Sequence, residues 1–361
     1  MTEPTSSSLP KASLPTGWPE PEALGFGVHL APYLVHCSQR GDSGWSAPRV
    51  DARGQAPLPV ASGGLQYGLS VFEGLKAYRG PEGALHLFRP REHARRLQAS
   101  ARRLSLPEVP EQRFLDACRI AVQVHEALVP PHRRGSLYLR PTLYADEEGL
   151  GLKLAAQHGF SVVATPCSDP PLKTLRLWAE PELIRAAPGG LGAAKTAANY
   201  AAGLGGLLRA RERGYDDVIW LDAAERRMLG EAGTMNLFVQ IGEQLLTPPL
   251  DGTILAGVTR DTLLTLLREQ GIDAQERAIS LDELADAERR GRLGCAFGCG
   301  TAARLVRITE IGDHWRSIRF ADNGFPTALA ARLKSVQEAG TAEHADWCIP
   351  VAGQRPGGAG A

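Results

Sequence analysis

Lys195 lies in a segment that combines a reactive amine with a backbone free to turn. The segment reads Gly189-Gly190-Leu191-Gly192-Ala193-Ala194-Lys195-Thr196-Ala197-Ala198-Asn199-Tyr200, and Lys195 is its only charged residue. Lysine is rare in this chain and occurs only at positions 11, 76, 153, 173, 195 and 334, among 40 Lys+Arg. Unlike arginine, lysine can lose its proton and form a Schiff base with a carbonyl. The segment therefore predicts a Schiff-base lysine, the alternative being an exposed lysine at a helix start.

Two later segments predict a site for an anion. Val258-Thr259 begins an expected helix directly after Gly257, so amides without an intrahelical partner and the helix dipole face an incoming ligand. Thr301 follows Gly298-Cys299-Gly300, where glycine lets the backbone approach a ligand closely and the threonine adds a hydroxyl. Together these segments favour a composite phosphate site.

The lysine segment is one of an ordered series of motifs. The series includes Leu65-Gln66-Tyr67-Gly68, Phe72-Glu73-Gly74, Leu87-Phe88-Arg89-Pro90, Ser136-Leu137-Tyr138-Leu139-Arg140-Pro141, Glu231-Ala232-Gly233-Thr234-Met235-Asn236-Leu237-Phe238, Gly252-Thr253-Ile254-Leu255-Ala256-Gly257-Val258-Thr259-Arg260 and Gly298-Cys299-Gly300-Thr301-Ala302. In order and spacing it resembles the branched-chain amino acid aminotransferases, PLP (pyridoxal 5'-phosphate) enzymes of class IV, or fold type IV. The resemblance covers roughly residues 20 to 351 and implies a two-domain α+β fold.

The resemblance also implies which residues hold PLP. Lys195 would form the Schiff base and then carry a proton from the substrate Cα, which makes it the catalytic residue. Glu231 would pair with the pyridine nitrogen and keep the ring an electron sink. The remaining cofactor contacts would be Tyr200 at the phenolic oxygen and Arg96, Val258, Thr259 and Thr301 at the phosphate. Packing for Tyr200, a solvated loop for Glu231 and a solvated helix face for Arg96 are the alternatives.

For the substrate, the resemblance implies an apolar pocket in a homodimer. The pocket residues would be Tyr67, Phe72, Tyr138, the backbone around Thr234 and Ala302, and Arg140, which would orient the two tyrosines. Leu152 matches a loop that reaches the partner subunit's site in relatives. The expected reaction moves an amino group between branched-chain L-amino acids and 2-oxoglutarate, giving 2-oxo acids and L-glutamate.

Several positions depart from the family pattern. They are Leu30-Ala31-Pro32-Tyr33-Leu34, Ala198, Ala256 and Cys295. The changes at 30–34 affect the expected side-chain preference more than the PLP chemistry, so an enzyme with a specialised apolar substrate is one alternative. Others are a D-amino acid aminotransferase, an aminodeoxychorismate lyase, a PLP-free Schiff-base aldolase or a non-catalytic PLP-binding protein.

Composition excludes several other classes of protein. The 40 Asp+Glu residues balance the 40 Lys+Arg residues, whereas nucleic-acid-binding proteins carry a basic excess. No apolar run reaches the roughly 18 residues of a membrane-spanning helix. Residues 1–20 lack the basic and apolar regions of a signal peptide, so a cytoplasmic protein is expected. The six cysteines, at 37, 118, 167, 295, 299 and 348, lack metal-ligand spacing, which predicts small buried thiols and no metal site.

The elements that must position these residues alternate irregularly. Strands are expected within 58–79 and at 84–88, 136–145, 159–166, 217–222, 235–240 and 244–248; helices are expected from Pro90, at 111–128 and 196–213, from Val258 to near Gly271, from Ser280 to near Gly291, and at 327–338. This order predicts α+β packing with mixed sheets. The expected divisions are a disordered tail at 1–20, an N-terminal domain at 21–168, a linker at 169–182 marked by Pro170-Pro171, a C-terminal PLP-binding domain at 183–351 and a flexible tail at 352–361.

Overall fold

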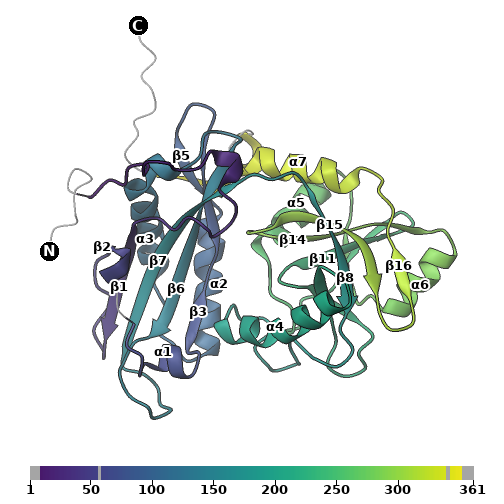
Figure 1. Cartoon of the computed structure of the whole chain (residues 1–361), viewed down its shortest axis with the longest axis horizontal. Helices are drawn as coiled ribbons and strands as arrows, with labels where there is room; N and C mark the ends of the chain where they lie inside the picture. The colour runs from purple at the N-terminus through teal and green to yellow at the C-terminus, as the bar shows by residue number, and fades with distance from the viewer. Residues whose placement is uncertain (1–8, 56–57, 339–341, 352–361) are drawn as a thin grey trace, which may run out of the picture. The chain divides into compact units, whose positions relative to one another are not determined.

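The chain divides into two compact units, each built on one β-sheet (Figure 1). The computed structural model describes residues 9–55, 58–338 and 342–351. The first unit extends to Pro170 and also takes in the chain from Ser335 onward, and the second unit is 171–334. Both units combine helices with sheet, so the expected α+β class is confirmed.

The sheet of the first unit is antiparallel throughout its described residues. Its strands are β1 (Tyr33–Arg40), β2 (Arg49–Ala52), β3 (Ser70–Phe72), β4 (Leu75–Arg79), β5 (Leu85–Phe88), β6 (Gly135–Ala145), β7 (Gln157–Ser168) and β17 (Cys348–Pro350). They lie in the order β17-β5-β4-β6-β7-β1-β2, with β3 also paired to β6. The long β6–β7 ladder places Tyr138 opposite Thr165 and Arg140 opposite Val163.

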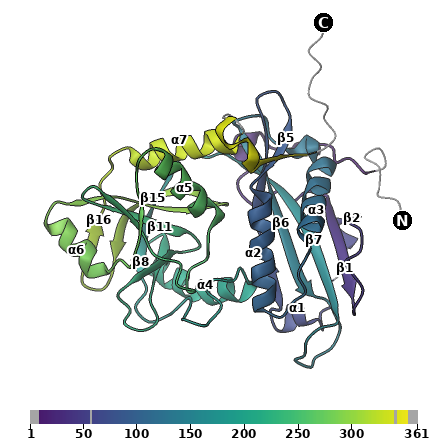
Figure 2. The ribbon, with the colours of Figure 1, turned by 180° about the vertical axis from the view of Figure 1, so that it is seen from behind.

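Two helices, α2 (Pro90–Arg103) and α3 (Glu111–Val124), lie beside this sheet (Figure 2). Proline at the first position of α2 suits a helix start, because its missing N–H has no intrahelical partner there. Shorter elements complete the unit: α1 (Gly63–Gln66) and 3-10 turns at Pro21–Ala23, Arg53–Gln55, Glu126–Leu128 and Ala342–Trp347.

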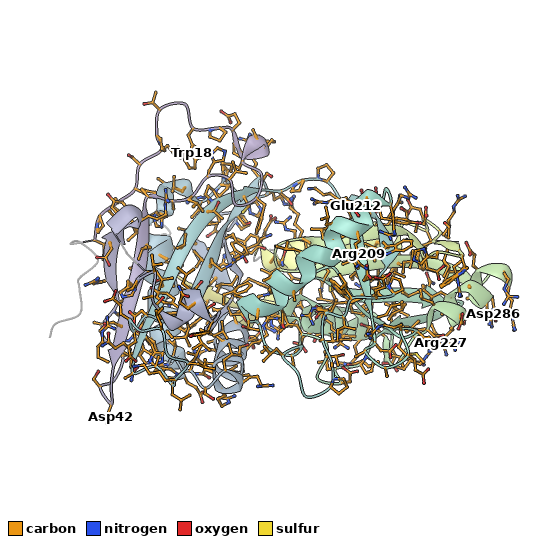
Figure 3. The ribbon with its side chains drawn as sticks, turned by 60° about the horizontal axis from the view of Figure 1, so that its bottom comes forward. Trp18, Asp42, Arg209, Glu212, Arg227 and Asp286 are labelled. Atoms are coloured by element: carbon orange, nitrogen blue, oxygen red, sulfur yellow. The ribbon has the colours of Figure 1, made fainter. Side chains whose placement is uncertain are left out.

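Residues 9–20 differ from the expected disordered tail, because they lie against the first unit. Ala12 is buried and its amide donates to the carbonyl of Val124 at 2.9 Å. Trp18, which is labelled in Figure 3, packs on the hydrophobic core, and its ring centroid lies 5.3 Å from that of His29. One buried alanine and one aromatic anchor therefore hold a Pro- and Ser-rich segment that composition alone assigns to a tail. Residues 1–8 and 352–361 of the two expected tails lie outside the described residues.

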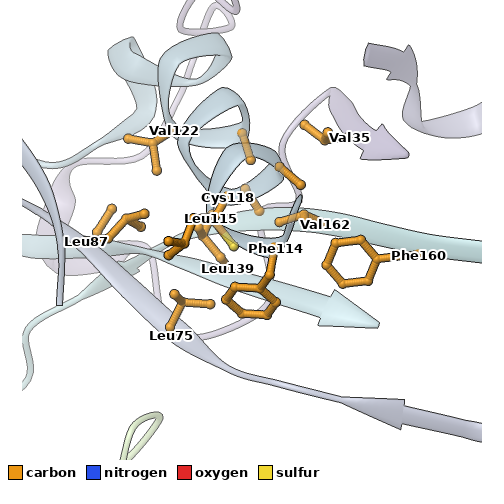
Figure 4. Packing of buried hydrophobic residues seen from close by; sticks show 14 of the residues in the cluster. Val35, Leu75, Leu87, Phe114, Leu115, Cys118, Val122, Leu139, Phe160 and Val162 are labelled. Carbon is orange, nitrogen blue, oxygen red and sulfur yellow. The ribbon is translucent and has the colours of Figure 1, made fainter. Parts of the chain in front are cut away.

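The core of the first unit forms where α3 meets the sheet (Figure 4). Phe114, Leu115 and Cys118 of α3 point toward Leu139 on β6 and Val162 on β7. All five side chains are almost completely buried. Burying each apolar side chain of this size contributes about 1.5–3 kcal/mol, so this interface is a principal source of the unit's stability.

The sheet of the second unit is mixed. Its strands are β8 (Lys173–Ala179), β9 (Asp217–Leu221), β10 (Leu229–Ala232), β11 (Asn236–Ile241), β12 (Gln244–Thr247), β13 (Gln275–Glu276), β14 (Leu293–Gly300), β15 (Arg304–Gly312) and β16 (Ser317–Arg319). The order is β10-β9-β8-β15-β14-β11-β12-β13, with β16 paired to β15. Because β8 and β9 are parallel, the chain between them must cross over, and that crossover carries Lys195.

The helices of the second unit begin close to where the sequence predicts them. They are α4 (Ala197–Glu212), α5 (Val258–Glu269) and α6 (Leu281–Arg289), and α7 (Phe325–Gln337) extends past the unit boundary. The hydroxyl of Ser280 accepts the amide of Glu283 at 3.0 Å, so the Ser280 cap of α6 is confirmed.

Three other expectations differ from the structure. Residues 58–69 contain α1 rather than strand, and the first strand of that region begins at Ser70. Residues 173–179, inside the expected linker, form β8, because its backbone pairs with β15 and β9 and its last three residues are buried. Residues 348–350 form β17 in the sheet of the first unit, so the C-terminal segment does not stay with the second unit.

Candidate functional site

Lys195 is held at the start of α4 by a fixed turn. It directly precedes Thr196, the N-cap residue of α4. The side-chain amide of Asn199 donates to the carbonyls of Leu191 at 2.8 Å and Ala194 at 2.9 Å, which ties the turn to the first turn of the helix. The Lys195 Nζ donates to the Tyr200 hydroxyl at 2.6 Å, and both side chains are half-buried. The structure thus places side by side two residues that the family resemblance assigns to the cofactor.

The turn needs glycine at position 192 because the backbone of Thr253 lies against it. A Cβ at this position would lie 2.3 Å from the carbonyl oxygen of Thr253. Such a distance is far below van der Waals contact, so any larger residue would push the turn away from the 252–257 segment. The lysine turn and the segment before α5 therefore pack backbone against backbone.

Glu231 is buried in the same unit. It lies within β10, one residue before the end of the strand, and 4% of its side chain is exposed, which excludes the alternative of a solvated loop glutamate. The Arg185 Nε lies 2.9 Å from Glu231 Oε2, and the Leu255 amide donates to Oε1 at 2.7 Å. A buried carboxylate requires such partners, because desolvation strongly disfavours an isolated charge.

The start of α5 offers backbone amides to an anion. Gly257 is its N-cap and gives no side-chain capping bond, so the amides of Val258 and Thr259 lack the usual side-chain acceptor. A Cβ at Gly257 would lie 2.0 Å from Asn236 Oδ1, so this cap must be glycine. Thr301 is half-buried at the end of β14, whereas Thr234 and Ala302 are exposed. These five expected contact residues all belong to the second unit.

Arg96 lies in the first unit and contacts a glutamate. Its Nε and Nη2 donate to Glu73 at 2.6 and 2.9 Å, and the His93 Nδ1 lies 2.6 Å from the same carboxylate. Burial alone would raise the pKa of Glu73, but the charges of Arg96 and His93 and their hydrogen bonds outweigh it and hold that pKa well below its usual range. The alternative of a solvated helix face is wrong for Arg96, whose side chain is 11% exposed.

Aromatic and cationic side chains meet on β3 and β6 of the first unit. Arg140 Cζ lies 4.6 Å from the centroid of the Phe72 ring, and its Nη2 donates to the Tyr138 hydroxyl at 3.0 Å. That hydroxyl would be 1.9 Å from a Cβ at Gly74, so glycine there makes room for the tyrosine. Phe26 packs edge-on against Tyr138 with 4.9 Å between ring centroids. The expected pairing of Arg140 with Tyr138 is therefore present.

Tyr67 and Leu152 are positioned differently. The Tyr67 hydroxyl donates to the carbonyl of Leu150, so its described contact runs to the 150 loop and not to Arg140. Leu152 is 75% exposed, and Leu150 and Leu154 beside it are exposed to a similar degree. An exposed run of leucines on a loop is typical of a surface that another protein covers.

The donor set of the second unit fits PLP. An aldehyde needs a primary amine, a pyridine nitrogen needs a carboxylate, and a phosphate needs backbone amides. Lys195, Glu231 and the α5 start supply these groups, and the close approaches at Gly192 and Gly257 fix the three segments against one another.

Sequence reasoning missed three residues that organise the site. Glu73 interrupts the apolar run Val71-Phe72-Glu73-Gly74-Leu75, and a charge in such a run signals a buried pair. His93 and Arg185 carry no such signal, because their partners lie far away in the sequence or are backbone groups.

Two other features of the described residues bear on function. They contain no group of three or more His, Cys, Asp and Glu side chains that could hold a metal ion. No described helix combines the length and the apolar character needed to cross a bilayer.

Comparison with known proteins agrees with the geometry. Residues 70–311 match the family model of class IV aminotransferases. Branched-chain-amino-acid transaminase 1 of Bacillus subtilis is 40% identical over 84% of this chain and 86% of its own length. The corresponding enzyme of Mycolicibacterium smegmatis is 40% identical over 86% of each chain. A solved structure of the Escherichia coli branched-chain amino acid aminotransferase matches 90% of this chain over the whole of its own length, with a TM-score of 0.72 and 26% identity. The chain therefore belongs to the PLP-dependent class IV aminotransferases, and within them to the branched-chain amino acid aminotransferases.

Proposed function

We propose that this protein moves the amino group between branched-chain L-amino acids and 2-oxoglutarate, producing branched-chain 2-oxo acids and L-glutamate. One observation carries the proposal: the amine of Lys195, held 2.6 Å from the Tyr200 hydroxyl, shares its unit with the buried carboxylate Glu231. The relatives at 40% identity, which are named branched-chain transaminases, support the choice of substrate.

In this proposal each residue of the second unit has a separate task. PLP, when bound, supplies the aldehyde that takes up the amino group and a ring that withdraws electrons from the substrate Cα. Lys195 accepts the proton from Cα through Nζ, and the Tyr200 hydroxyl fixes the direction of that amine. Glu231 would pair with the pyridine nitrogen, and Val258, Thr259 and Thr301 would bind the phosphate.

The pocket proposal rests on Tyr67, Phe72 and Tyr138, with Arg140 as the cationic neighbour. Aromatic walls favour apolar side chains over charged ones. Arg140 lies against both Phe72 and Tyr138, so its positive charge is beside the proposed pocket. It would pair there with the γ-carboxylate of glutamate. Thr234 and Ala302 would contribute backbone amides for the substrate α-carboxylate.

We also propose a homodimer in the cytoplasm. Exposed leucines support the dimer, at Leu150, Leu152 and Leu154 of the first unit and at Leu204 and Leu208 of α4. In the dimer, Leu152 would reach the site of the partner. All six cysteines are free thiols, as is typical of a reducing compartment.

A panel of amino donors with 2-oxoglutarate tests the proposal, with glutamate formation as the measurement. We expect turnover with L-leucine, L-isoleucine and L-valine at kcat/KM values within about 200-fold of one another, because one methylene is worth only about 1–3 kcal/mol. The Lys195→Ala variant is the negative control for glutamate formation.

Two outcomes of the panel would contradict the assignment. Turnover of D-alanine in place of the three L-donors would favour the D-amino acid aminotransferase alternative. Efficient use of another apolar donor, with negligible use of these three, would assign the departures at residues 30–34 to a changed substrate.

A further inference from the structure

Arg185 is a buried arginine whose side chain makes contacts in three separate segments. It lies in the crossover between β8 and α4, ten positions before Lys195, and 9% of its side chain is exposed. Its Nε pairs with Glu231 at 2.9 Å. Its Nη1 donates to the carbonyl of Thr253 at 2.9 Å and to that of Gly192 at 3.3 Å.

The geometry of these contacts is specific to arginine. A guanidinium is a flat group with five N–H donors in fixed directions, so one side chain can serve a carboxylate and two carbonyls at once. Lysine carries a single nitrogen, which can pair with Glu231 but cannot also span both carbonyls. The contacts therefore need the shape of the side chain as well as its charge.

The two carbonyls belong to the closest backbone approach around the lysine. Thr253 and Gly192 pack so tightly that a Cβ at Gly192 would lie 2.3 Å from the Thr253 oxygen. Arg185 joins these two backbones from the side, and two residues after Thr253 the amide of Leu255 binds the other oxygen of Glu231. A movement of Arg185 would thus be transmitted both to Glu231 and to the turn that carries Lys195.

The same chain of contacts continues to α5. The Asn236 Nδ2 donates to the carbonyl of Leu255 at 2.9 Å, and Asn236 Oδ1 lies against the Gly257 cap. The carboxylate for the pyridine nitrogen, the lysine turn and the helix start for the phosphate are therefore linked through a few buried polar contacts, of which Arg185 makes three.

We propose that Arg185 is a positioning residue that fixes the carboxylate of Glu231 relative to the turn of Lys195. It would act through Glu231 and the turn, and not by contact with substrate or cofactor. The inference rests on the roles proposed above for Lys195 and Glu231. If those two groups must meet opposite parts of one rigid ring, their separation has to be set before the ring binds, and Arg185 sets it.

The test compares Arg185→Met and Arg185→Lys with Arg209→Met. Arg209 lies on α4 of the same unit (Figure 3) and forms ion pairs with Glu182 at 2.5 Å and with the buried Glu180 at 3.5 Å, so its variant controls for loss of an arginine that also pairs with a buried glutamate. Three properties are measured: the dissociation constant of PLP from the apoenzyme, the visible spectrum of the bound cofactor against pH, and kcat at full PLP loading.

We expect Arg185→Met to weaken PLP binding about tenfold or more and to lower kcat of the loaded enzyme about 100-fold, since small misplacements of reacting groups have effects of this size. Arg185→Lys should recover most of the PLP affinity, because it restores a charge opposite Glu231, but should leave kcat and the pH midpoint of the spectrum altered. Arg209→Met should leave all three properties unchanged.

If Arg185→Met does not fold, Arg185→Lys alone still tests whether Arg185 positions Glu231. Wild-type PLP affinity, spectrum and kcat in Arg185→Lys would overturn the inference, as would an Arg185→Met enzyme that is less stable but fully active once loaded. A failure of the proposed function gives a different result. The wild type would then form no glutamate from the branched-chain donors, or Lys195→Ala would form it as fast as the wild type, whatever happens at Arg185.

Discussion

Glu73 in the first unit and Glu231 in the second are each buried against an arginine, and these two pairs are built differently. In the first unit Glu73 is completely buried and meets His93 and Arg96, which lie three residues apart on α2. In the second unit Glu231 meets Arg185 from the crossover before α4 and the Leu255 amide from the segment before α5.

The origin of the partners indicates what each pair does. Both partners of Glu73 come from a single helix, so the pair fastens α2 to the β3–β4 junction and acts within one local structure. The partners of Glu231 come from two loops that also carry or contact the lysine turn, so that pair joins segments on which the chemistry depends. Similar buried charges thus serve stability in the first unit and active-site geometry in the second.

Lys195→Ala should have the largest effect, because it removes the reactive group of the second unit. We expect kcat to fall by at least about three orders of magnitude, since Lys195 both holds the cofactor and moves the proton at Cα. Glutamate formation from L-leucine and 2-oxoglutarate is the measurement.

Two observations accompany that variant. The purified wild-type protein should be yellow, and borohydride reduction should fix the cofactor on Lys195, as mass spectrometry of peptides can show. Circular dichroism should find the Lys195→Ala fold unchanged. Near-normal turnover in this variant would end the assignment of the second unit as the site of chemistry.

Glu73→Gln and Glu231→Gln test the comparison directly. Glu73→Gln should lower the free energy of unfolding by about 3–5 kcal/mol, because it leaves the Arg96 charge buried without its carboxylate. The folded, PLP-loaded variant should keep turnover within about tenfold of wild type, whereas Glu231→Gln should lose about 100-fold or more. Urea unfolding and kcat at full loading are the measurements, and equal losses of turnover would remove the distinction between the pairs.

The pH dependence sharpens the prediction for Glu73. The folded state holds the pKa of Glu73 well below the unfolded value of about 4.3. The pair therefore stabilises the fold fully above that unfolded value, and its contribution is lost as the pH falls below it. Urea midpoints of the wild type should drop more steeply between pH 6 and pH 3.5 than those of Glu73→Gln. Parallel curves would show that Glu73 is not the group responsible.

The parts of the fold that carry a local signal could be predicted. Helix α2 begins at Pro90, α5 begins at Val258 after a glycine, and α6 has its Ser280 cap, each as the sequence indicates. Such signals arise within one turn of the chain, where neighbouring residues decide the outcome. The family motif assigns Lys195 and Tyr200 to one site, but their spacing does not predict the contact between them, because residues five apart on a helix point about 140° away from each other.

Other parts depend on contacts that no short segment contains. Strand β8 follows Pro170-Pro171, so it resembles a linker until β9 and β15 pair with it. Strand β17 joins a sheet whose other strands lie more than 170 residues earlier. Arg185 binds backbone carbonyls, which have no residue type to recognise. In each case tertiary pairing determines the role, and local pattern does not.

The smallest expected effect concerns the buried thiols. Their reactivity measures whether solvent and reagents are excluded equally from the cores of the two units. Burial raises the pKa of Cys37 in the first unit to about 12, and burial raises that of Cys299 in the second unit to about 12. At pH 8 only about one thiol in 10,000 of each kind would be ionised, so native protein should react slowly with a thiolate-seeking disulfide reagent. Cys348, only partly buried, should be the fastest of these three, and Cys348→Ser is the control.

The rates for Cys37 and Cys299 should stay equal to within about tenfold in the apoenzyme and the PLP-loaded enzyme. Equal protection would mean that both cores are closed before the cofactor binds, so the contacts around Glu231 are preformed. If Cys299 becomes reactive in the apoenzyme while Cys37 stays protected, the second unit opens without PLP. The contacts of Glu231 and Arg185 would then hold their segments together only when the cofactor is bound. The Glu73 pair, in contrast, would hold α2 in place with or without PLP, so the two pairs would differ in stability as well as in geometry.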